Sequence, residues 1–532
     1  MNDFQPNSNV LTNELIVIAN KSWPKEYFRE ISDIDDIKKF YNSSYKNFHE
    51  EIELVLNKYH PASWVRIAYI QLELWTLRML ETDSQDKELK DKILVFSPIG
   101  RYGWRYVLEK SLEKTNDSIV ELFNEQRPGD NDISKMFTLL LGLSYCAEIS
   151  NFMHYFKEQF KTAKLVFSGD IYKKFPKLEE GSRLFLDELI DYYNHENIDY
   201  NLVPELNYIE NQDLMSQVDL LLNDYFGFTI NEVEIVIQAL KEKVVPEISA
   251  TILVMPTDAL ICLLSEYTSL PVERIRNLVN FVFFEVNDLN YEKRDYLKKS
   301  QNNRMLNFAG CKFSLDDNFK TIYEDNALKS GDVKMFKNHS IVSFALLWEW
   351  KINFIERLIF GKRTDLKEIS NDLKISITKI EDFFHRNIFE NNIKNILINR
   401  GLPCLSLDEV EKNKLPCGEI DAISIDEENK IIYVIEAKNI SPIKDARASG
   451  KTISDHYKQK KYHAKFLKKI NWVEANFDVL SKIFNVQISE EYKVEKYFVT
   501  GVPSPMKFLV NDYVVLTYFE FFNLINKKYE SN

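Results

Sequence analysis

Glycine and proline are scarce in this chain, which has 14 Gly and 15 Pro among 532 residues. Because both residues interrupt helices and shape tight turns, their scarcity argues against a turn-rich all-β fold and favours long helices. Hydrophobic residues make up 45% of the chain, and aromatics are abundant, with 36 Phe and 27 Tyr. A chain of this length and composition can bury the cores of roughly two to four domains.

Cysteine is also scarce, and no two of the five cysteines are spaced as a CxxC pair, which argues against a zinc ribbon. The odd number of cysteines and the lack of a signal peptide predict a reducing, cytoplasmic location. No apolar run approaches the roughly 18 residues that a membrane helix needs, so no membrane partner is expected.

An overall positive charge is missing as well, since the formal net charge is -13 at pH 7. A protein of this balance that binds nucleic acid must gather its positive charge locally, because phosphate contacts supply most non-specific affinity. Such a gathering occurs over 454–470, which we predict to be one helix. Four lysines recur there at helical spacing and are expected to contact the DNA backbone, although such a run is also typical of a solvated helix face. They are Lys458, Lys461, Lys465 and Lys468.

The pattern of apolar residues divides the chain into two regions. Residues 1–365 show mainly the period of helices, and we predict an all-helical region that regulates, oligomerises or recognises a target. Polar stretches at 195–213 and 314–338 mark sub-boundaries within it. After the boundary near Gly361, residues 366–532 alternate between helix and strand patterns, which predicts an α/β domain with a mixed sheet. The expected fold class is therefore α followed by α/β.

The most informative stretch reads GEIDAISIDEENKIIYVIEAKN. Two apolar strands, 420–425 and 431–437, flank a polar turn, and each carries an acid, Asp421 in the first and Glu436 in the second. Lys438 points to the same side as Glu436, because side chains alternate along a strand. Two carboxylates and an ammonium group on adjacent strands are what a metal-dependent phosphodiesterase requires. The two acids are hard oxygen ligands that suit Mg²⁺ or Mn²⁺.

With these residues the segment resembles the restriction endonuclease-like, PD-(D/E)xK, nuclease superfamily. It is similar to archaeal Holliday-junction resolvases, nuclease-related domains and methyl-directed restriction nucleases over about 378–527. The Pro of the family name is absent, since Ile420 precedes Asp421. The resemblance implies a Mg²⁺-dependent DNA endonuclease, and by analogy a role in restriction or phage defence. A homodimer or higher homo-oligomer is expected, because one site per chain cuts one strand at a time.

The resemblance also implies an acid on the helix before the sheet and a polar residue on a later helix. Glu390, on the helix predicted over 377–399, matches the acid, and Glu381 on the same helix is the alternative. Gln459 matches the later polar residue, with a solvated helix position as the competing interpretation. Glu419 is a minor candidate, because it shares the face of the first acid only if the strand starts earlier.

The resemblance implies a role for each of these residues. Asp421, Glu436 and Glu390 are the expected metal ligands. Lys438 is expected to position the attacking water or to balance charge on the phosphate. Gln459 is expected to hold Lys438 or a backbone phosphate in register.

Other interpretations of the same residues remain open. The hairpin charges could belong to an ordinary edge hairpin. The chain could be a non-catalytic nucleic-acid-binding or scaffold protein that retains a nuclease fold. It could also act on RNA as a ribonuclease or toxin.

Overall fold

The chain divides into two compact units in the computed structural model. The first comprises Met1–Met153, Phe160–Glu179 and Val218–Ile355, and the second His154–Gln159, Glu180–Gln217 and Glu356–Asn532. The residues that the structure describes are 17–19, 21, 30–80, 103–112, 127–160, 164–166, 177–178, 184, 188–189, 192, 208–244, 252–285, 309–314, 338–410, 413–440 and 446–529. The sub-boundaries expected at 195–213 and 314–338 lie mostly outside these residues.

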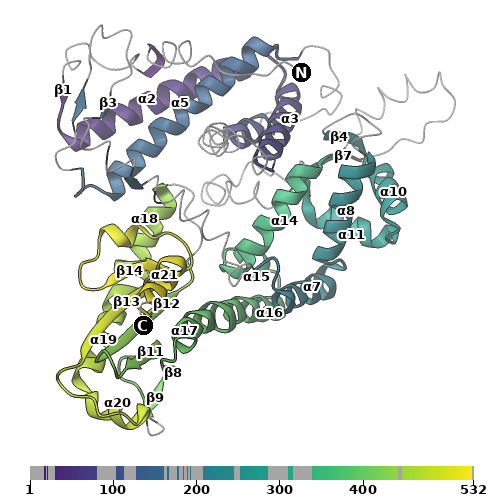
Figure 1. Cartoon of the computed structure of the whole chain (residues 1–532). Helices are drawn as coiled ribbons and strands as arrows, with labels where there is room; N and C mark the ends of the chain where they lie inside the picture. The colour runs from purple at the N-terminus through teal and green to yellow at the C-terminus, as the bar shows by residue number, and fades with distance from the viewer. Residues whose placement is uncertain are drawn as a thin grey trace, which may run out of the picture. The chain divides into compact units, whose positions relative to one another are not determined.

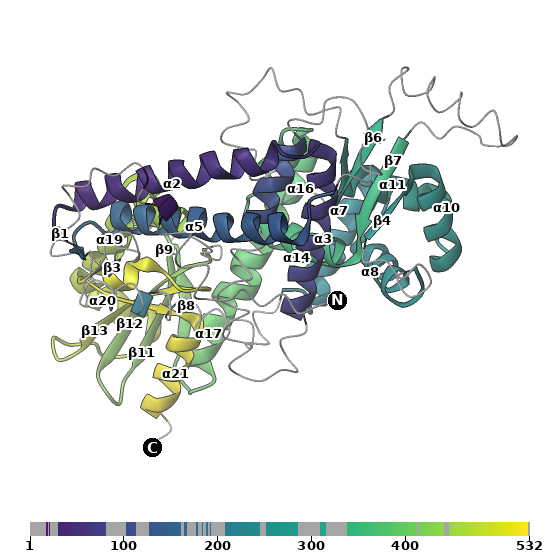
Figure 2. The same cartoon turned by 90° about the horizontal axis from the view of Figure 1, so that it is seen from above.

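Two long helices, α2 (Ile34–Leu56) and α5 (Asp130–Tyr155), run side by side in the first unit (Figures 1 and 2). Ser150 Oγ on α5 donates a hydrogen bond of 2.8 Å to Asn42 Oδ1 on α2. Other helical elements of this part of the chain include residues 103–112, α3 (Pro61–Leu80), α7 (Gln212–Phe226), α8 (Ile230–Ala239), the π-helical turn η5 (Leu240–Val244), α10 (Thr257–Thr268), α11 (Val272–Val282) and α14 (Phe344–Ile359).

The prediction that 1–365 is all-helical is wrong, because this region contains two small sheets. One has the strand order β4-β7-β6-β5 and the other the order β1-β2-β3. The strands are short, and β4 pairs with β7 from far along the chain, so neither sheet produces a long local period. Their bounds are β1 (Glu30–Ile31), β2 (Leu165–Val166), β3 (Lys177–Leu178), β4 (Ile252–Pro256), β5 (Phe283–Glu285), β6 (Gly310–Ser314) and β7 (Asn338–Ser343).

Helix α5 is the one described helix that is long and apolar enough to cross a membrane by length and composition. Within its most apolar window, 67% is buried inside the protein. Burial of this kind is usual for the core helix of a soluble protein, so the helix is weak support for a membrane span.

A helical segment leads into the sheet of the second unit. It begins with α15 (Thr364–Lys367) and continues through α16 (Asn371–Asp382), the π-helical η8 (Phe383–Glu390) and α17 (Asn391–Ile398). The helix predicted over 377–399 is confirmed. Its end follows from Gly401, whose φ of +79° suits a residue without a β-carbon.

The sheet of the second unit has the strand order β14-β13-β12-β11-β8 and is mixed, as predicted. Strands β11 and β12 form the expected antiparallel hairpin, whereas β13 runs parallel to both β12 and β14. The bounds are β8 (Cys404–Leu407), β11 (Ile420–Asp426), β12 (Ile431–Lys438), β13 (Lys493–Thr500) and β14 (Val514–Thr517), with a separate short pair, β9 (Glu409–Val410) and β10 (Asn413–Lys414).

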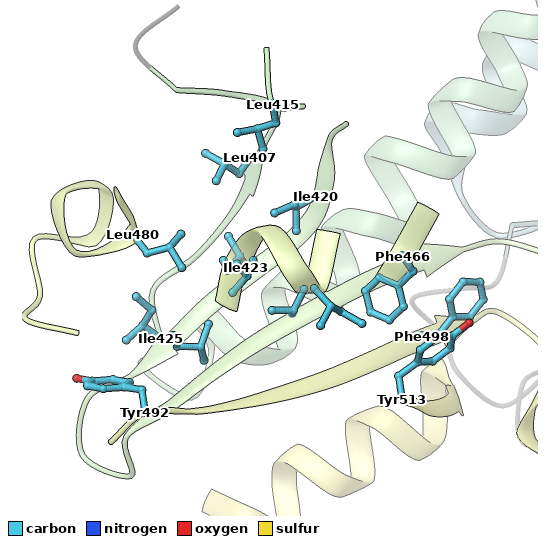
Figure 3. Packing of buried hydrophobic residues seen from close by; sticks show 14 of the residues in the cluster. Leu407, Leu415, Ile420, Ile423, Ile425, Phe466, Leu480, Tyr492, Phe498 and Tyr513 are labelled. Atoms are coloured by element: carbon cyan, nitrogen blue, oxygen red, sulfur yellow. The ribbon is translucent and has the colours of Figure 1, made fainter. Parts of the chain in front are cut away.

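Helices cover both faces of this sheet. Residues of α17 and α21 (Tyr518–Tyr529) pack with alternate residues of β12 on one face. On the other face, α19 (Tyr462–Ala475) and α20 (Phe477–Phe484) pack on Ile423, Val434 and Phe498. Figure 3 shows this second core, with Phe466 of α19 beside Phe498. Strands β11 and β12 therefore have two buried faces, and any polar side chain on either face must find a partner.

The prediction of a single helix over 454–470 is wrong. Helix α18 (Ala446–Ser454) continues into the π-helical η9 (Asp455–Gln459), and the chain then breaks before α19. Lys461 has a φ of +55° at the break. Lys458 and Lys461 therefore do not share a helical face with Lys465 and Lys468, which lie on α19. A short 3-10 helix, η10 (Pro505–Phe508), lies between β13 and β14.

Candidate functional site

Three charged side chains of the hairpin lie on the face of the sheet that α19 covers. On β12, Tyr433 and Ile435 belong to the opposite core, so Glu436 and Lys438 alternate onto the α19 face. Asp421 on β11 occupies the same face. The two acids are buried, with an exposed fraction of 5% for Asp421 and 2% for Glu436, and Lys438 is half-buried. The predicted convergence of these residues is confirmed.

Lys438 lies between the two acids. Its Nζ is 2.7 Å from Asp421 Oδ2 and 3.0 Å from Glu436 Oε1. Those two carboxylate oxygens are therefore at most about 5.7 Å apart, the sum of the two contacts. The Ala437 N–H also donates to Asp421 Oδ2 at 2.9 Å, and Lys438 donates to the Ala437 carbonyl at 2.9 Å. Backbone and side-chain groups together hold the acids at one point.

A second lysine completes the cluster. Lys469 on α19 lies 3.3 Å from Asp421 Oδ1 and also pairs with Glu436 Oε2. It was not among the residues predicted for the site, because its pairing depends on how α19 crosses the sheet. A signal was present in the sequence, since Lys469 interrupts the buried stripe formed by Phe466 and Ile470.

The charges of the cluster shift its pKa values. Burial alone would raise the pKa of Asp421, but Lys438, Lys469 and the hydrogen bonds outweigh it and hold that pKa below its usual value. Burial raises the pKa of Glu436, and the charge of Asp421 adds to the shift. Burial would lower the pKa of Lys438, yet Glu436 and Asp421 raise it. Asp421 is thus the acid that holds its negative charge most firmly.

Glu390 lies close enough to this cluster for its charges to act on it. Burial raises the pKa of Glu390 to about 7, and the charge of Asp421 adds to the shift. Its Oε1 is 3.3 Å from Nε2 of His385. Burial, with the charge of Lys438 adding to it, lowers the pKa of His385 to about 4, so this imidazole is neutral at pH 7. Glu390 is therefore a carboxyl group that changes charge near neutrality.

The alternative acids lie elsewhere. Glu381 lies on α16, and its Oε1 forms an ion pair of 2.5 Å with Lys367 Nζ. Glu419 is exposed, as expected for a residue outside the strand. Of the helix-borne candidates, Glu390 is the one whose pKa responds to Asp421.

The role predicted for Gln459 is not supported by its position. Gln459 ends η9, is exposed, and makes no hydrogen bond with Lys438 within the part of the chain that the structure describes. The break at Lys461 separates it from α19. The residue of this region that contacts the site is Lys469, which pairs with the two acids.

An aromatic and histidine cluster lies on the same side of the sheet. His456 Nε2 is 2.6 Å from Tyr513 Oη, and His463 Nδ1 is 3.1 Å from the same oxygen. Burial raises the pKa of Tyr513, with a smaller contribution from the charge of Glu436. Burial lowers the pKa of His456 to about 4. His456 is therefore neutral at pH 7 beside the Tyr513 hydroxyl.

The oxygen atoms of the cluster can be compared with the ligands that a metal ion needs. No group of three or more His, Cys, Asp or Glu side chains is placed to hold a metal among the described residues, so Glu390 does not complete a three-acid site in this conformation. Asp421 and Glu436 nevertheless converge, and the Ala437 carbonyl lies beside them. Mg²⁺ commonly binds through one or two carboxylates and keeps several waters. The carboxylates of Asp421 and Glu436 fit such an ion once one lysine ammonium group moves away from them.

The lysines expected to contact DNA are all solvent-exposed: Lys458, Lys461, Lys465 and Lys468. Lys465 and Lys468 are three residues apart on α19, directly before the buried Lys469. Two exposed cations thus share the helix that reaches the acids.

Comparison of the chain with protein-family models, with curated proteins and with solved structures found no match. The resemblance to the PD-(D/E)xK nucleases therefore stays a prediction drawn from the motif. The case for a function depends on the geometry of the site.

Proposed function

We propose that this chain is a metal-dependent phosphodiesterase that cuts DNA as an endonuclease, with residues 366–532 as its PD-(D/E)xK nuclease domain. The observation that carries the proposal is the meeting of Asp421, Glu436 and Lys438 at one buried point, from adjacent strands and in the order of that motif. Buried groups with shifted pKa values are common at catalytic sites, because catalysis uses the same burial and charge pairing.

In this proposal Asp421 and Glu436 hold Mg²⁺ or Mn²⁺, with the Ala437 carbonyl as a further ligand. The bound ion supplies Lewis-acid polarisation of the phosphate and lowers the pKa of a water. Lys438 stays beside the acids and balances negative charge that develops on the phosphate oxygens. Glu390, with a pKa of about 7, accepts or donates a proton at working pH.

The surroundings of the site support a nucleic acid as the substrate, and the proposal names DNA, with RNA as the alternative. Lys465 and Lys468 place positive charge on α19, the helix that packs over the site, although the whole chain has a net charge of -13. The proposal includes a cytoplasmic homodimer, because two sites are needed to cut both strands together. Residues 1–365 would then regulate cutting, oligomerise or recognise the target, as in restriction or phage defence.

The test is nicking of supercoiled plasmid by the full chain with Mg²⁺, with Mn²⁺ and with a chelator. The wild type should nick only with a metal, and Lys438→Ala should slow nicking by at least about a hundredfold. Lys482→Ala, at an exposed lysine on α20, is the matched control and should nick at the wild-type rate. Labelled RNA in place of plasmid separates a ribonuclease from a DNA endonuclease. Absence of cutting in every arm would reject the proposal.

One observation favours a second candidate, a non-catalytic scaffold that retains a nuclease fold. Two buried acids are balanced by two lysines, and such a neutral network can be purely structural. A scaffold would bind DNA without cutting it in any metal, and Lys438→Ala would then change stability alone. The same plasmid assay, with binding measured in parallel, separates the two candidates.

A further inference from the structure

Lys469 stands where an apolar residue would be expected. Along α19 the buried residues are Phe466, Lys469, Ile470 and Val473, which is the spacing of one helix face packed on the sheet. The exposed fraction of Lys469 is 6%. Placing an ammonium group there costs free energy unless fixed partners compensate it. A helix that needed only to cover the sheet would carry an apolar side chain at this position.

The partners of Lys469 are the same two acids that Lys438 holds, but through different oxygens. Lys438 Nζ contacts Asp421 Oδ2 and Glu436 Oε1. Lys469 takes Asp421 Oδ1 at 3.3 Å together with Glu436 Oε2. All four oxygens of the two carboxylates therefore contact an ammonium group. Lys469 bridges the acids as a divalent cation would.

The two lysines lie on different elements, Lys438 on strand β12 and Lys469 on helix α19. Lys438 is on the same strand as Glu436, so its backbone cannot leave the acids without disturbing the sheet. Lys469 belongs to a helix and reaches the acids by a flexible four-carbon stem, whose rotation can withdraw the charge while α19 stays in place. Because the proposed function keeps Lys438 beside the acids to balance charge on the phosphate, Lys469 is the cation left to give way.

We infer that Lys469 is the resident counter-ion of the resting site, and that a divalent cation binds Asp421 and Glu436 by displacing its ammonium group. This inference rests on the metal site of the proposed function and adds its regulation. Lys469 keeps the acids paired and neutralised without metal, and it lowers metal affinity by competing for the same oxygens. Lys469 acts here through the acids, as a positioning residue.

The test is Mn²⁺ binding to the full chain at pH 7.5, measured from the free-ion signal in electron paramagnetic resonance without nucleic acid. Lys469→Met keeps the apolar stem and removes the charge, so it should bind Mn²⁺ at least about tenfold more tightly than the wild type. Lys469→Gln is the second variant and should change affinity in the same direction. Lys482→Met, at the exposed lysine on α20, should leave affinity unchanged.

The outcomes separate this inference from the proposed function. Mn²⁺ affinity in both Lys469 variants that equals or falls below that of the folded wild type would overturn the displacement role, while the nuclease proposal would stand. Stoichiometric binding that is lost in Asp421→Asn would locate the ion at the acids. If neither the wild type nor the Lys469 variants bind Mn²⁺, both the inference and the metal role in the proposed function are overturned. Thermal unfolding of each variant shows whether it folds. If one Lys469 variant does not fold, the Mn²⁺ affinity of the other decides the outcome.

Discussion

Lys438 Nζ lies 2.7 Å from Asp421 Oδ2, although the two residues stand on different strands and are 17 positions apart. The pairing is a direct result of the hairpin, in which β11 and β12 run antiparallel and Ala422 lies opposite Ile435. That register brings Asp421 beside Ala437, whose N–H donates to the same oxygen. Both residues also contact other charged side chains, Lys438 contacting Glu436 and Asp421 contacting Lys469. Substitution of either residue tests the contact.

A double-mutant cycle tests the energetic link between these two residues. Asp421→Asn and Lys438→Met should each destabilise the protein by about 3 kcal/mol or more, because each leaves an unbalanced buried charge. The double variant should cost less than the sum by about 1–3 kcal/mol, since Glu436 and Lys469 then balance each other. Urea unfolding of the full chain measures the four free energies.

A surface pair provides the control for this cycle. Arg276 Nη1 lies 3.3 Å from Glu273 Oε2, with side chains 45% and 70% exposed. Its coupling should stay below about 1 kcal/mol, because solvent screens the pair. If the Asp421 and Lys438 substitutions proved additive like those of the surface pair, the buried pair would not form one network.

Glu390 should make stability depend on pH. Its pKa is raised from 4.5 to about 7 in the folded chain, so folding favours the protonated form. The associated stability is fully present below pH 4.5 and is lost as pH rises through about 7. Glu390→Gln keeps the shape without the charge and should stabilise the protein by roughly 2 kcal/mol at pH 8, with little effect near pH 4.

Urea unfolding of wild type and Glu390→Gln at several pH values between 4 and 8 measures this difference. Glu381→Gln is the comparison on the same helical segment, and it removes an ion pair with Lys367. Burial also raises the pKa of Glu381, but Lys367 opposes the shift, so that variant should gain less stability at neutral pH than Glu390→Gln. A constant difference between wild type and Glu390→Gln across the range would show that Glu390 does not carry the shifted pKa.

The exposed lysines of α19 should contribute to DNA affinity through charge. Lys465→Glu combined with Lys468→Glu should weaken binding at low salt and reduce the slope of log affinity against log salt by about 1 or more. Fluorescence anisotropy with a labelled duplex, titrated at several salt concentrations, measures both quantities. Charge reversal at Lys482 on α20 is the control, and an equal loss there would mean that α19 has no special place in binding.

The hairpin and its three charged side chains could be predicted from sequence because they depend on local pattern. Alternation along β11 and β12 fixes which side chains share a face, and the polar turn between them fixes the pairing. The helix before the sheet was equally accessible, since apolar residues recur regularly up to Gly401. Residues such as Asp421 and Glu436 could therefore be placed together from the sequence.

What the sequence did not reveal depends on tertiary packing. Lys469 pairs with Glu436 across 33 positions, and only the crossing of α19 over the sheet brings them together. The break at Lys461 has no local signal, because lysine has no preference for a positive φ. Gln459 was misplaced for the same reason, since its predicted position assumed an unbroken helix.

The proposal that Asp421, Glu436 and Lys438 form a catalytic site is tested most directly by plasmid nicking with Mg²⁺, comparing wild type with Asp421→Asn at equal folded concentration. Asparagine keeps the size of the side chain but removes the charge that Lys438 and Lys469 hold in place. We expect metal-dependent nicking by the wild type and a loss of at least about a hundredfold in the variant. Equal nicking by both proteins, or none by the folded wild type, would contradict the assignment of this cluster as the active site.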